Sequence, residues 1–155
     1  DPPIIAFLDG DFSDYPEELP ELLKPIQEKG YDLVIGSRML GEREPGALLP
    51  QAMFGNWLAS FFIRLFWGYR FTDLGPFRAI RTDALRRMMM SDPTYGWTVE
   101  MQIKAAKLRM KCTEVPVRYR KRIGESKVTG TISGTVRASV KILYTILKYL
   151  VVKVG

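Results

Sequence analysis

Two aspartates directly follow an apolar run near the start of the chain. Residues 4–8 read Ile-Ile-Ala-Phe-Leu, and Asp9-Gly10-Asp11 comes next. Such a run is typical of a buried strand, and a strand that ends on two carboxylates directs both toward one place. Ligands bind at the carboxyl ends of strands in open α/β sheets. The pattern therefore predicts an α/β fold with a ligand site at this end of the strand.

The expected ligand at Asp9 and Asp11 is Mg²⁺ or Mn²⁺. Two carboxylates this close repel each other unless a proton or a divalent cation lies between them. These cations prefer carboxylate and phosphate oxygens, so they commonly bridge a protein to substrate phosphates. A solvated Asp-Gly turn stays open as an alternative. A phosphatase of the haloacid dehalogenase type is disfavoured, because Phe12-Ser13-Asp14 follows and no later pair of adjacent aspartates occurs.

The composition excludes several kinds of chemistry. The 155 residues form one domain or a large part of one, and 46% are hydrophobic, which is enough for a core. No histidine is present, which excludes imidazole acid–base catalysis and the usual zinc sites. The single cysteine, Cys112, excludes an internal disulfide. A net charge of +6 suits anionic partners such as nucleotides and phospholipids, and no motif for reading nucleic acid is present.

The first third of the chain has the pattern of a βαβ unit. After the first strand, Asp14 with Glu17 three residues later predicts a capped helix start, and Gly30 predicts its end. Pro25 is expected to kink or shorten this helix. Residues 32–36 form a second apolar strand, so the sequence predicts a parallel sheet. Because the chain opens on a core strand, we expect earlier strands in a longer protein.

Alternating helices and strands continue to the end of the chain. The expected elements are an aromatic-rich helix over 52–66, a strand over 77–80, helices over 82–90 and 97–108, and a strand over 113–119. Residues 118–131 are basic and Gly-rich and predict a mobile loop. Residues 132–154 predict a basic amphipathic helix that docks on the domain or on an anionic membrane. No stretch is long and apolar enough to span a bilayer.

Three features outside the aspartate pair are candidates for chemistry. Asp73 lies in a Gly-Pro turn, where it either forms an Asx-turn or faces a substrate as a base. Glu100 precedes Lys104 by four residues, so it forms a surface ion pair or acts as an acid in a pocket. Residues 118–127 carry five positive side chains and a glycine hinge. This loop is either solvated or closes over a phosphate as a lid.

Eight short motifs, in order and covering nearly the whole chain, resemble those of family 2 glycosyltransferases with the GT-A fold. The resemblance is to the branch that transfers sugars to dolichyl or polyprenyl phosphate. The motifs are Leu8–Asp11, Pro16–Pro20, Val34–Arg38, Phe54–Asn56, Thr72–Ala79, Val99–Met101, Glu114–Val117 and Arg122–Lys127. Each motif is short, so the resemblance rests on all eight occurring in the same order as in that family.

The resemblance implies a fold and a division of the chain. The fold is the Rossmann-like GT-A fold of nucleotide-diphospho-sugar transferases, an α/β architecture with a mixed, mostly parallel sheet flanked by helices and its N-terminal strands missing. Residues 1–131 then form the C-terminal part of the catalytic domain, and 132–155 form a basic amphipathic helix near the membrane.

The resemblance also implies an activity and a set of site residues. The activity is a metal-dependent, inverting transfer from a UDP- or GDP-sugar to a polyprenyl or dolichyl phosphate at the cytoplasmic face of a membrane. The protein attaches there peripherally or through segments outside this chain. The implied residues are Asp9 and Asp11 for the metal, Asp11, Asp73 and Glu100 for catalysis, and Arg38, Arg122, Ser126 and Lys127 for phosphate binding.

Two departures from the family pattern keep alternatives open. Members of this branch often carry an arginine just before the Phe-Gly-Asn segment, where this chain has Met53. Residues 75–77, Gly-Pro-Phe, replace a more usual small polar residue and glycine before the phenylalanine. A saccharide or other acceptor is therefore one alternative. A non-catalytic, membrane-associated scaffold domain is another.

Overall fold

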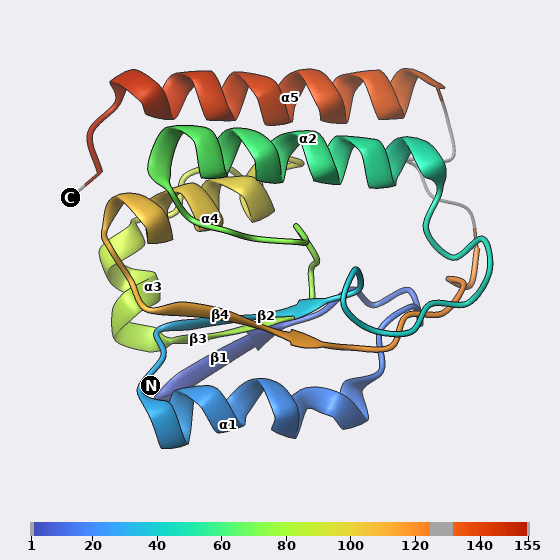
Figure 1. The fold of residues 1–155 in the computed structure, drawn as a ribbon, viewed down its shortest axis with the longest axis horizontal. Helices are drawn as coiled ribbons and strands as arrows, with labels where there is room; N and C mark the ends of the chain where they lie inside the picture. Colours follow the sequence, from blue (N-terminus) through green and yellow to red (C-terminus); the bar gives the residue numbers. More distant parts are fainter. Residues whose placement is uncertain (1, 125–131, 155) are drawn as a thin grey trace.

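A mixed four-stranded sheet runs through the middle of the structure, a computed structural model that describes residues 2–124 and 132–154 (Figure 1). The strands are β1 (Ile4–Phe7), β2 (Leu33–Ser37), β3 (Arg78–Arg81) and β4 (Cys112–Pro116), in the spatial order β1-β3-β2-β4. β3 is antiparallel to both β1 and β2, and β4 is parallel to β2. Three strands therefore point one way and β3 points the other. The mixed sheet expected from the sequence is confirmed, although the central position of β3 makes two of the three strand pairs antiparallel.

The two strands of the βαβ unit predicted at the start of the chain are not neighbours in the sheet, because β3 lies between them. β1 and β2 run in the same direction, but Ile80 of β3 lies opposite Ile5 of β1 and also opposite Leu33 of β2. Ala79 and Ile80 are fully buried because strands flank them on both sides and helices cover both faces. Which strand occupies the centre depends on contacts far apart in sequence, and the local pattern of residues 4–36 does not contain them.

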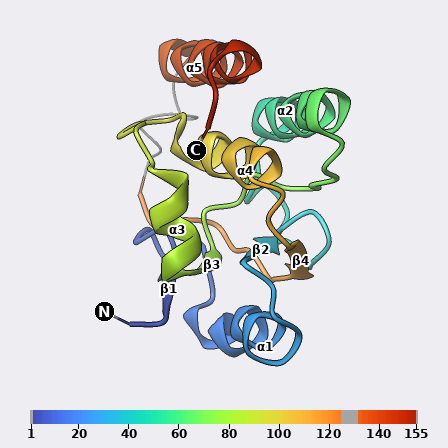
Figure 2. The ribbon, with the colours of Figure 1, turned by 90° about the vertical axis from the view of Figure 1, so that its left-hand side faces the viewer.

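Helices cover both faces of the sheet. They are α1 (Leu19–Lys29), preceded by one 3-10 turn at Pro16–Glu18, then α2 (Pro50–Trp67), α3 (Thr82–Met88), α4 (Trp97–Lys107) and α5 (Ile132–Val151). α1 lies alone on one face, and the other helices lie on the opposite face, with α5 outermost (Figures 1 and 2). α2 and α5 contact each other and run side by side, and both contact α4.

Two apolar clusters hold these layers together. Alternate residues of β2 point to opposite faces, so Val34 packs toward α1 while Leu33 and Ile35 pack toward α2 and α4. The cluster under α1 consists of Leu22, Ile26, Val34, Phe77, Ala79 and Val117. The larger cluster reaches α5 through Ile146 and Tyr149. α5 is therefore part of the same packed body.

The start of the first helix differs from the prediction. Asp14 does not cap it: this residue is buried, and its Oδ2 accepts a hydrogen bond from the Asp9 backbone N–H at 3.1 Å. The helix begins instead at Leu19, and Pro25 does not end it. The predicted end is confirmed, because Gly30 takes the left-handed conformation (φ 65°) that follows a helix. Asp14 bonds to Asp9, five residues earlier, because the loop folds back toward the end of β1.

The basic segment after β4 is partly described. The backbone N–H groups of Arg120 and Ile123 donate to the carbonyls of Ser13 (3.0 Å) and Asp11 (2.9 Å). These bonds tie 120–123 to the loop that carries the aspartates, whereas the sequence predicted a mobile loop over the whole of 118–131. Ser126 and Lys127 lie outside the described residues.

The helix predicted near the C-terminus is confirmed as α5, although it ends at Val151 rather than 154. Among the described residues, none of the helices has the length and apolarity needed to cross a membrane. The division of the chain at residue 131 stays a prediction.

Candidate functional site

Asp9 and Asp11 lie just beyond the end of β1, where the chain turns sharply. Phe12 has φ 72°, an unusual value for a residue with a side chain, and it turns the backbone so that Ser13 faces Asp11. The Ser13 backbone N–H donates to Asp11 Oδ1 at 3.0 Å, and the Ser13 hydroxyl donates to the same oxygen. The second oxygen, Oδ2, lies 3.2 Å from Nη1 of Arg122. The turn therefore fixes the direction of the Asp11 carboxylate.

The two carboxylates differ in how readily they ionise. Burial and the neighbouring charge of Asp11 raise the pKa of Asp9. Burial also acts to raise the pKa of Asp11, but the hydrogen bonds from Ser13 and the charge of Arg122 outweigh it, so this pKa lies below its ordinary value. Among the described residues, none donates a hydrogen bond to the Asp9 carboxylate.

This donor set fits a divalent cation that also binds substrate. In the described part of the chain no three acidic, cysteine or histidine side chains gather, so the acidic ligands available there are the two aspartates. Mg²⁺ is commonly bound by one or two carboxylates plus substrate phosphates and water. Asp9 and Asp11 would hold such a cation together with substrate phosphates and water.

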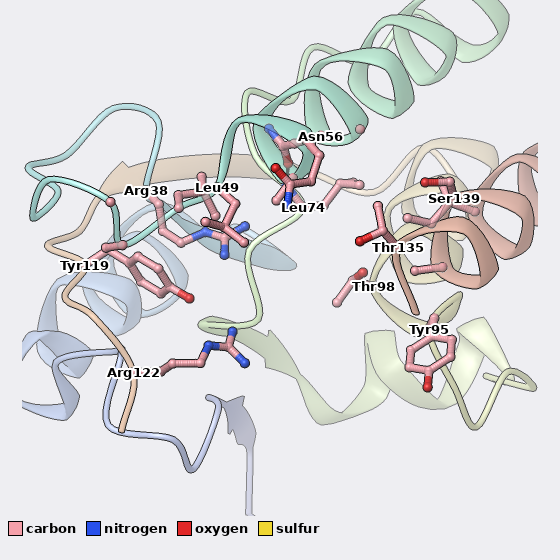
Figure 3. Close-up of a pocket in the computed structure, with 18 of the residues that line it drawn as sticks. Arg38, Leu49, Asn56, Leu74, Tyr95, Thr98, Tyr119, Arg122, Thr135 and Ser139 are labelled. Carbon is pink, nitrogen blue, oxygen red and sulfur yellow. Dashed lines mark hydrogen bonds between the residues drawn. The ribbon is translucent and has the colours of Figure 1, made fainter. Parts of the chain in front are cut away.

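A cavity of about 590 Å³ opens next to the aspartates. It lies between the segment 46–49, the first turns of α2, the start of α4 and the first half of α5. Figure 3 shows Arg122 at one end, Arg38 and Tyr119 beside it, and Thr98, Thr135 and Ser139 on the opposite side. Asp9 and Asp11 do not line the cavity, so Arg122 joins the aspartate site to it.

The cavity is cationic at one end and largely apolar elsewhere. Its cations are Arg38, Lys121 and Arg122. Its apolar lining comes from Ala47, Leu48, Leu49, Ala52, Leu74, Ala138 and Ile142. Met53 does not line it, although its neighbours Gln51 and Ala52 do. Sequence analysis missed Tyr119 and Lys121 as site residues; their place in the basic segment was a usable signal.

Asp73 holds Arg38 at the cavity wall. Arg38 Nε and Nη2 donate to the two oxygens of Asp73, each at 2.8 Å, and the Arg38 backbone N–H donates to Oδ2 at 2.8 Å. Asp73 is fully buried, while the Arg38 side chain keeps 12% exposure and lies over the ring of Tyr119. The catalytic role predicted for Asp73 stays a prediction, but its geometry is that of a residue that positions Arg38.

The turn that carries Asp73 is clamped from several elements. Asn56 of α2 donates to the Thr72 carbonyl at 2.8 Å and accepts from the Leu74 N–H at 2.6 Å. Glu114 of β4 accepts from the Thr72 and Asp73 N–H groups at 2.9 and 3.1 Å. Arg78 donates to the Leu74 carbonyl at 3.2 Å. The sequence reasoning did not assign this role to Asn56 or Glu114; the signal for Asn56 was an amide in a helix otherwise rich in aromatics.

Glu100 of α4 is buried, and its carboxylate connects α4 with α5 and with the segment before α4. Its carboxylate accepts hydrogen bonds from the Tyr149 hydroxyl (2.6 Å), the Ser91 hydroxyl (2.7 Å) and the Asp92 N–H (2.8 Å), and pairs with Lys104 at 2.8 Å. Burial acts to raise its pKa, but these partners lower it to about 2. The ion pair expected on the surface is therefore buried.

Glu100 does not line the cavity; through Tyr149 it anchors α5, which forms one wall. Its predicted catalytic role stays a prediction.

The sequence model described as Glycosyl transferase family 2 matches residues 1–89, so the chain belongs to this family. The expectation drawn from the ordered motifs is thereby confirmed.

Curated relatives agree with this assignment. The chain is 34% identical over 140 residues to an undecaprenyl-phosphate mannosyltransferase of Micrococcus luteus, covering 84% of the chain and 55% of that protein. It is 32% identical over 126 residues to Agl6, a hexosyltransferase of low-salt glycan biosynthesis in Haloferax volcanii, covering 80% of the chain and 30% of that protein. The chain thus spans about half the length of the mannosyltransferase.

A solved structure confirms the expected fold. Glucosyl-3-phosphoglycerate synthase of Mycobacterium tuberculosis, crystallised with phosphoglyceric acid, superposes with a TM-score of 0.68 at 18% identity. The match covers 96% of this chain and 50% of that protein. At this identity the likeness concerns the fold alone.

Proposed function

We propose that the protein transfers a sugar from a UDP- or GDP-sugar to a polyprenyl or dolichyl phosphate, with inversion at the sugar carbon and with Mg²⁺ or Mn²⁺ at Asp9 and Asp11. The observation that carries the proposal is the cavity beside Asp11, which has cationic side chains at one end and, away from them, apolar side chains interspersed with uncharged polar ones. A lipid phosphate has the same division into an anionic head and an apolar chain. The mannosyltransferase relative, whose name contains undecaprenyl phosphate, supports this acceptor class.

Asp9 and Asp11 would hold the donor diphosphate through the cation. A cation in this place offsets the negative charge that develops on the departing nucleoside diphosphate. Ser13 keeps Asp11 ionised and directed, because it donates two hydrogen bonds to one carboxylate oxygen.

The acceptor phosphate would lie among Arg38, Lys121 and Arg122. Guanidinium groups match phosphate oxygens well, and Asp73 holds Arg38 in a fixed orientation. A phosphate oxygen is already anionic, so the attack needs no strong base. This agrees with the geometry of Asp73 and Glu100, whose carboxylates are buried and engaged by other side chains.

Two helices that line the cavity, α2 and α5, also carry stripes of exposed apolar side chains. On α2 the exposed side chains are Phe54, Trp57, Phe61 and Leu65, and on α5 they are Val136, Val140, Tyr144, Leu147 and Val151. The spacing of three and four residues places each set along one side of its helix. α2 and α5 both line the cavity, and exposed Arg64 and Arg137 add positive charge beside the stripes. We propose that this surface rests on the cytoplasmic face of an anionic membrane.

A transfer assay with membranes tests the proposed function. The protein, as its gene encodes it, is incubated with membranes, Mn²⁺ or Mg²⁺, and labelled UDP- and GDP-sugars in turn. We expect label in the organic phase, in an acid-labile lipid, with one donor and only with added metal. Label confined to water-soluble product would favour a saccharide acceptor. Absence of transfer with every donor would favour a scaffold domain.

Vesicle binding tests the membrane surface separately. In co-sedimentation, the double variant Trp57→Ser, Phe61→Ser is expected to bind phosphatidylglycerol-containing vesicles at least about tenfold more weakly than the unaltered protein. Burying one aromatic ring fully in the bilayer contributes roughly 1.5–3 kcal/mol to the binding free energy, and the variant loses two rings. The matched control is Met89→Ser, which removes an exposed apolar side chain at the end of α3. Equal binding of the double variant and the control would contradict the proposed surface.

A further inference from the structure

Arg122 occupies the oxygen of Asp11 that a cation would use. Ser13 takes Oδ1 with two hydrogen bonds, so Oδ2 is the oxygen left for a positive partner. In the structure that partner is Nη1 of Arg122, at 3.2 Å. The Ile123 N–H donates to the Asp11 carbonyl at 2.9 Å, so the backbone next to Arg122 is fixed on the same residue. The pair is therefore built into the loop contact.

The same guanidinium also faces the cavity. Arg122 lines the cavity beside Arg38 and Lys121, and its side chain is 33% exposed (Figure 3). A partly exposed ion pair is weak, so a divalent cation can displace it. Once displaced from Asp11, the guanidinium stays at the cavity wall because backbone bonds of Arg120 and Ile123 hold the segment in place.

We infer that Arg122 and the divalent cation compete for Asp11 Oδ2, and that cation binding releases Arg122 to the phosphate in the cavity. The inference rests on the proposed cation site at Asp9 and Asp11. Without the cation, Arg122 balances the charge of Asp11 and is a poorer phosphate ligand. With the cation bound, the guanidinium is available to an anion. Binding of the two ligands is thus coupled, and the coupling is reciprocal.

Direct measurement of Mn²⁺ binding tests the competition without any turnover. Free Mn²⁺ is followed by electron paramagnetic resonance as the protein, in its natural length and free of substrates, is titrated at low ionic strength. We expect Arg122→Ala to bind Mn²⁺ about 3–10-fold more tightly than the unaltered protein, because a competing cation has been removed. Arg122→Lys keeps the charge and is expected to lie between the two.

The matched control is Arg118→Ala. Arg118 belongs to the same basic segment, but its ion pairs go to Glu17 and Glu18. Its loss removes the same net charge and is expected to change Mn²⁺ affinity by less than about twofold. If Arg118→Ala and Arg122→Ala tighten binding equally, net charge explains the effect and the competition is overturned.

Asp11→Asn separates failure of this inference from failure of the proposed function. If Asp11→Asn abolishes Mn²⁺ binding while Arg122→Ala leaves the affinity unchanged, the cation site stands and the competition is overturned. If Asp11→Asn binds Mn²⁺ as well as the unaltered protein, the cation site itself is wrong. Tighter binding by Arg122→Ala together with loss of binding by Asp11→Asn supports both.

Discussion

The Asp11→Asn variant is expected to lose about 10³-fold of sugar transfer to lipid phosphate, which corresponds to roughly 4 kcal/mol of transition-state stabilisation. The substitution keeps the shape of the side chain but removes its charge. An asparagine Oδ1 can still accept both hydrogen bonds from Ser13, so the turn after β1 should persist. What is lost is the anionic Oδ2, the oxygen that faces Arg122 and the proposed cation.

Two measurements separate loss of the cation site from loss of the fold. The melting temperature of Asp11→Asn should lie within a few degrees of the unaltered protein, because the affected ion pair is partly exposed and worth at most about 1 kcal/mol. The residual activity should no longer respond to added Mn²⁺. Asp83→Asn, which changes an exposed aspartate on α3, is the matched control and should keep full activity. Full transfer by Asp11→Asn would remove this residue from the mechanism.

The position of the aspartate site was predictable from local sequence. An apolar run that ends on Asp9-Gly10-Asp11 needs no distant information to be recognised as a strand followed by paired carboxylates. The helices over 50–67, 97–107 and 132–151 were predictable for the same reason, since each has a long apolar pattern with helical spacing. The family resemblance supplied the fold class, because motifs in a fixed order carry the topology that single motifs lack.

The partners of buried polar side chains were not predictable in this way. Asp14 has a good local pattern for a helix cap, yet it bonds to Asp9, and Glu100 has a good pattern for a surface pair, yet it is buried against Tyr149. The partner of Asp14 lies five residues earlier in the same loop, and that of Glu100 comes from another helix, α5. Local rules state what a polar group needs and not which distant group supplies it.

Two of the three carboxylates assigned to catalysis, Asp73 and Glu100, show the same limit. The sequence shows that residues 73 and 100 are acidic. Whether their carboxylates are buried, and which side chains they pair with, depends on the packed structure. Both side chains are fully buried and form ion pairs, Asp73 with Arg38 and Glu100 with Lys104. Because a base has to reach the proton that it removes, this geometry favours positioning roles. Asp73 provides the sharper test, because its partner Arg38 lines the cavity.

The Asp73→Asn variant is expected to lower the free energy of unfolding by about 3 kcal/mol, measured by urea denaturation. Asparagine offers one acceptor and an NH₂ group where the aspartate offers two anionic oxygens. Arg38 then lies nearly buried, with a donor facing its guanidinium. The matched control is again Asp83→Asn, whose pair with Arg81 is 44% and 61% exposed and should contribute less than about 0.5 kcal/mol. Equal stability of the two variants would contradict the buried clamp.

Kinetics on the same variant distinguish a positioning residue from a base. If Asp73 only orients Arg38, the Asp73→Asn enzyme that remains folded should show a raised KM for the lipid phosphate and a smaller change in kcat. Arg38→Lys should show the same pattern, since lysine keeps the charge but loses the fork that matches both carboxylate and phosphate. If Asp73 removes a proton in the reaction, kcat should instead fall for Asp73→Asn alone. Arg38 can bind the phosphate but cannot accept a proton, so a fall in kcat for Asp73→Asn that Arg38→Lys does not share would identify Asp73 as a base.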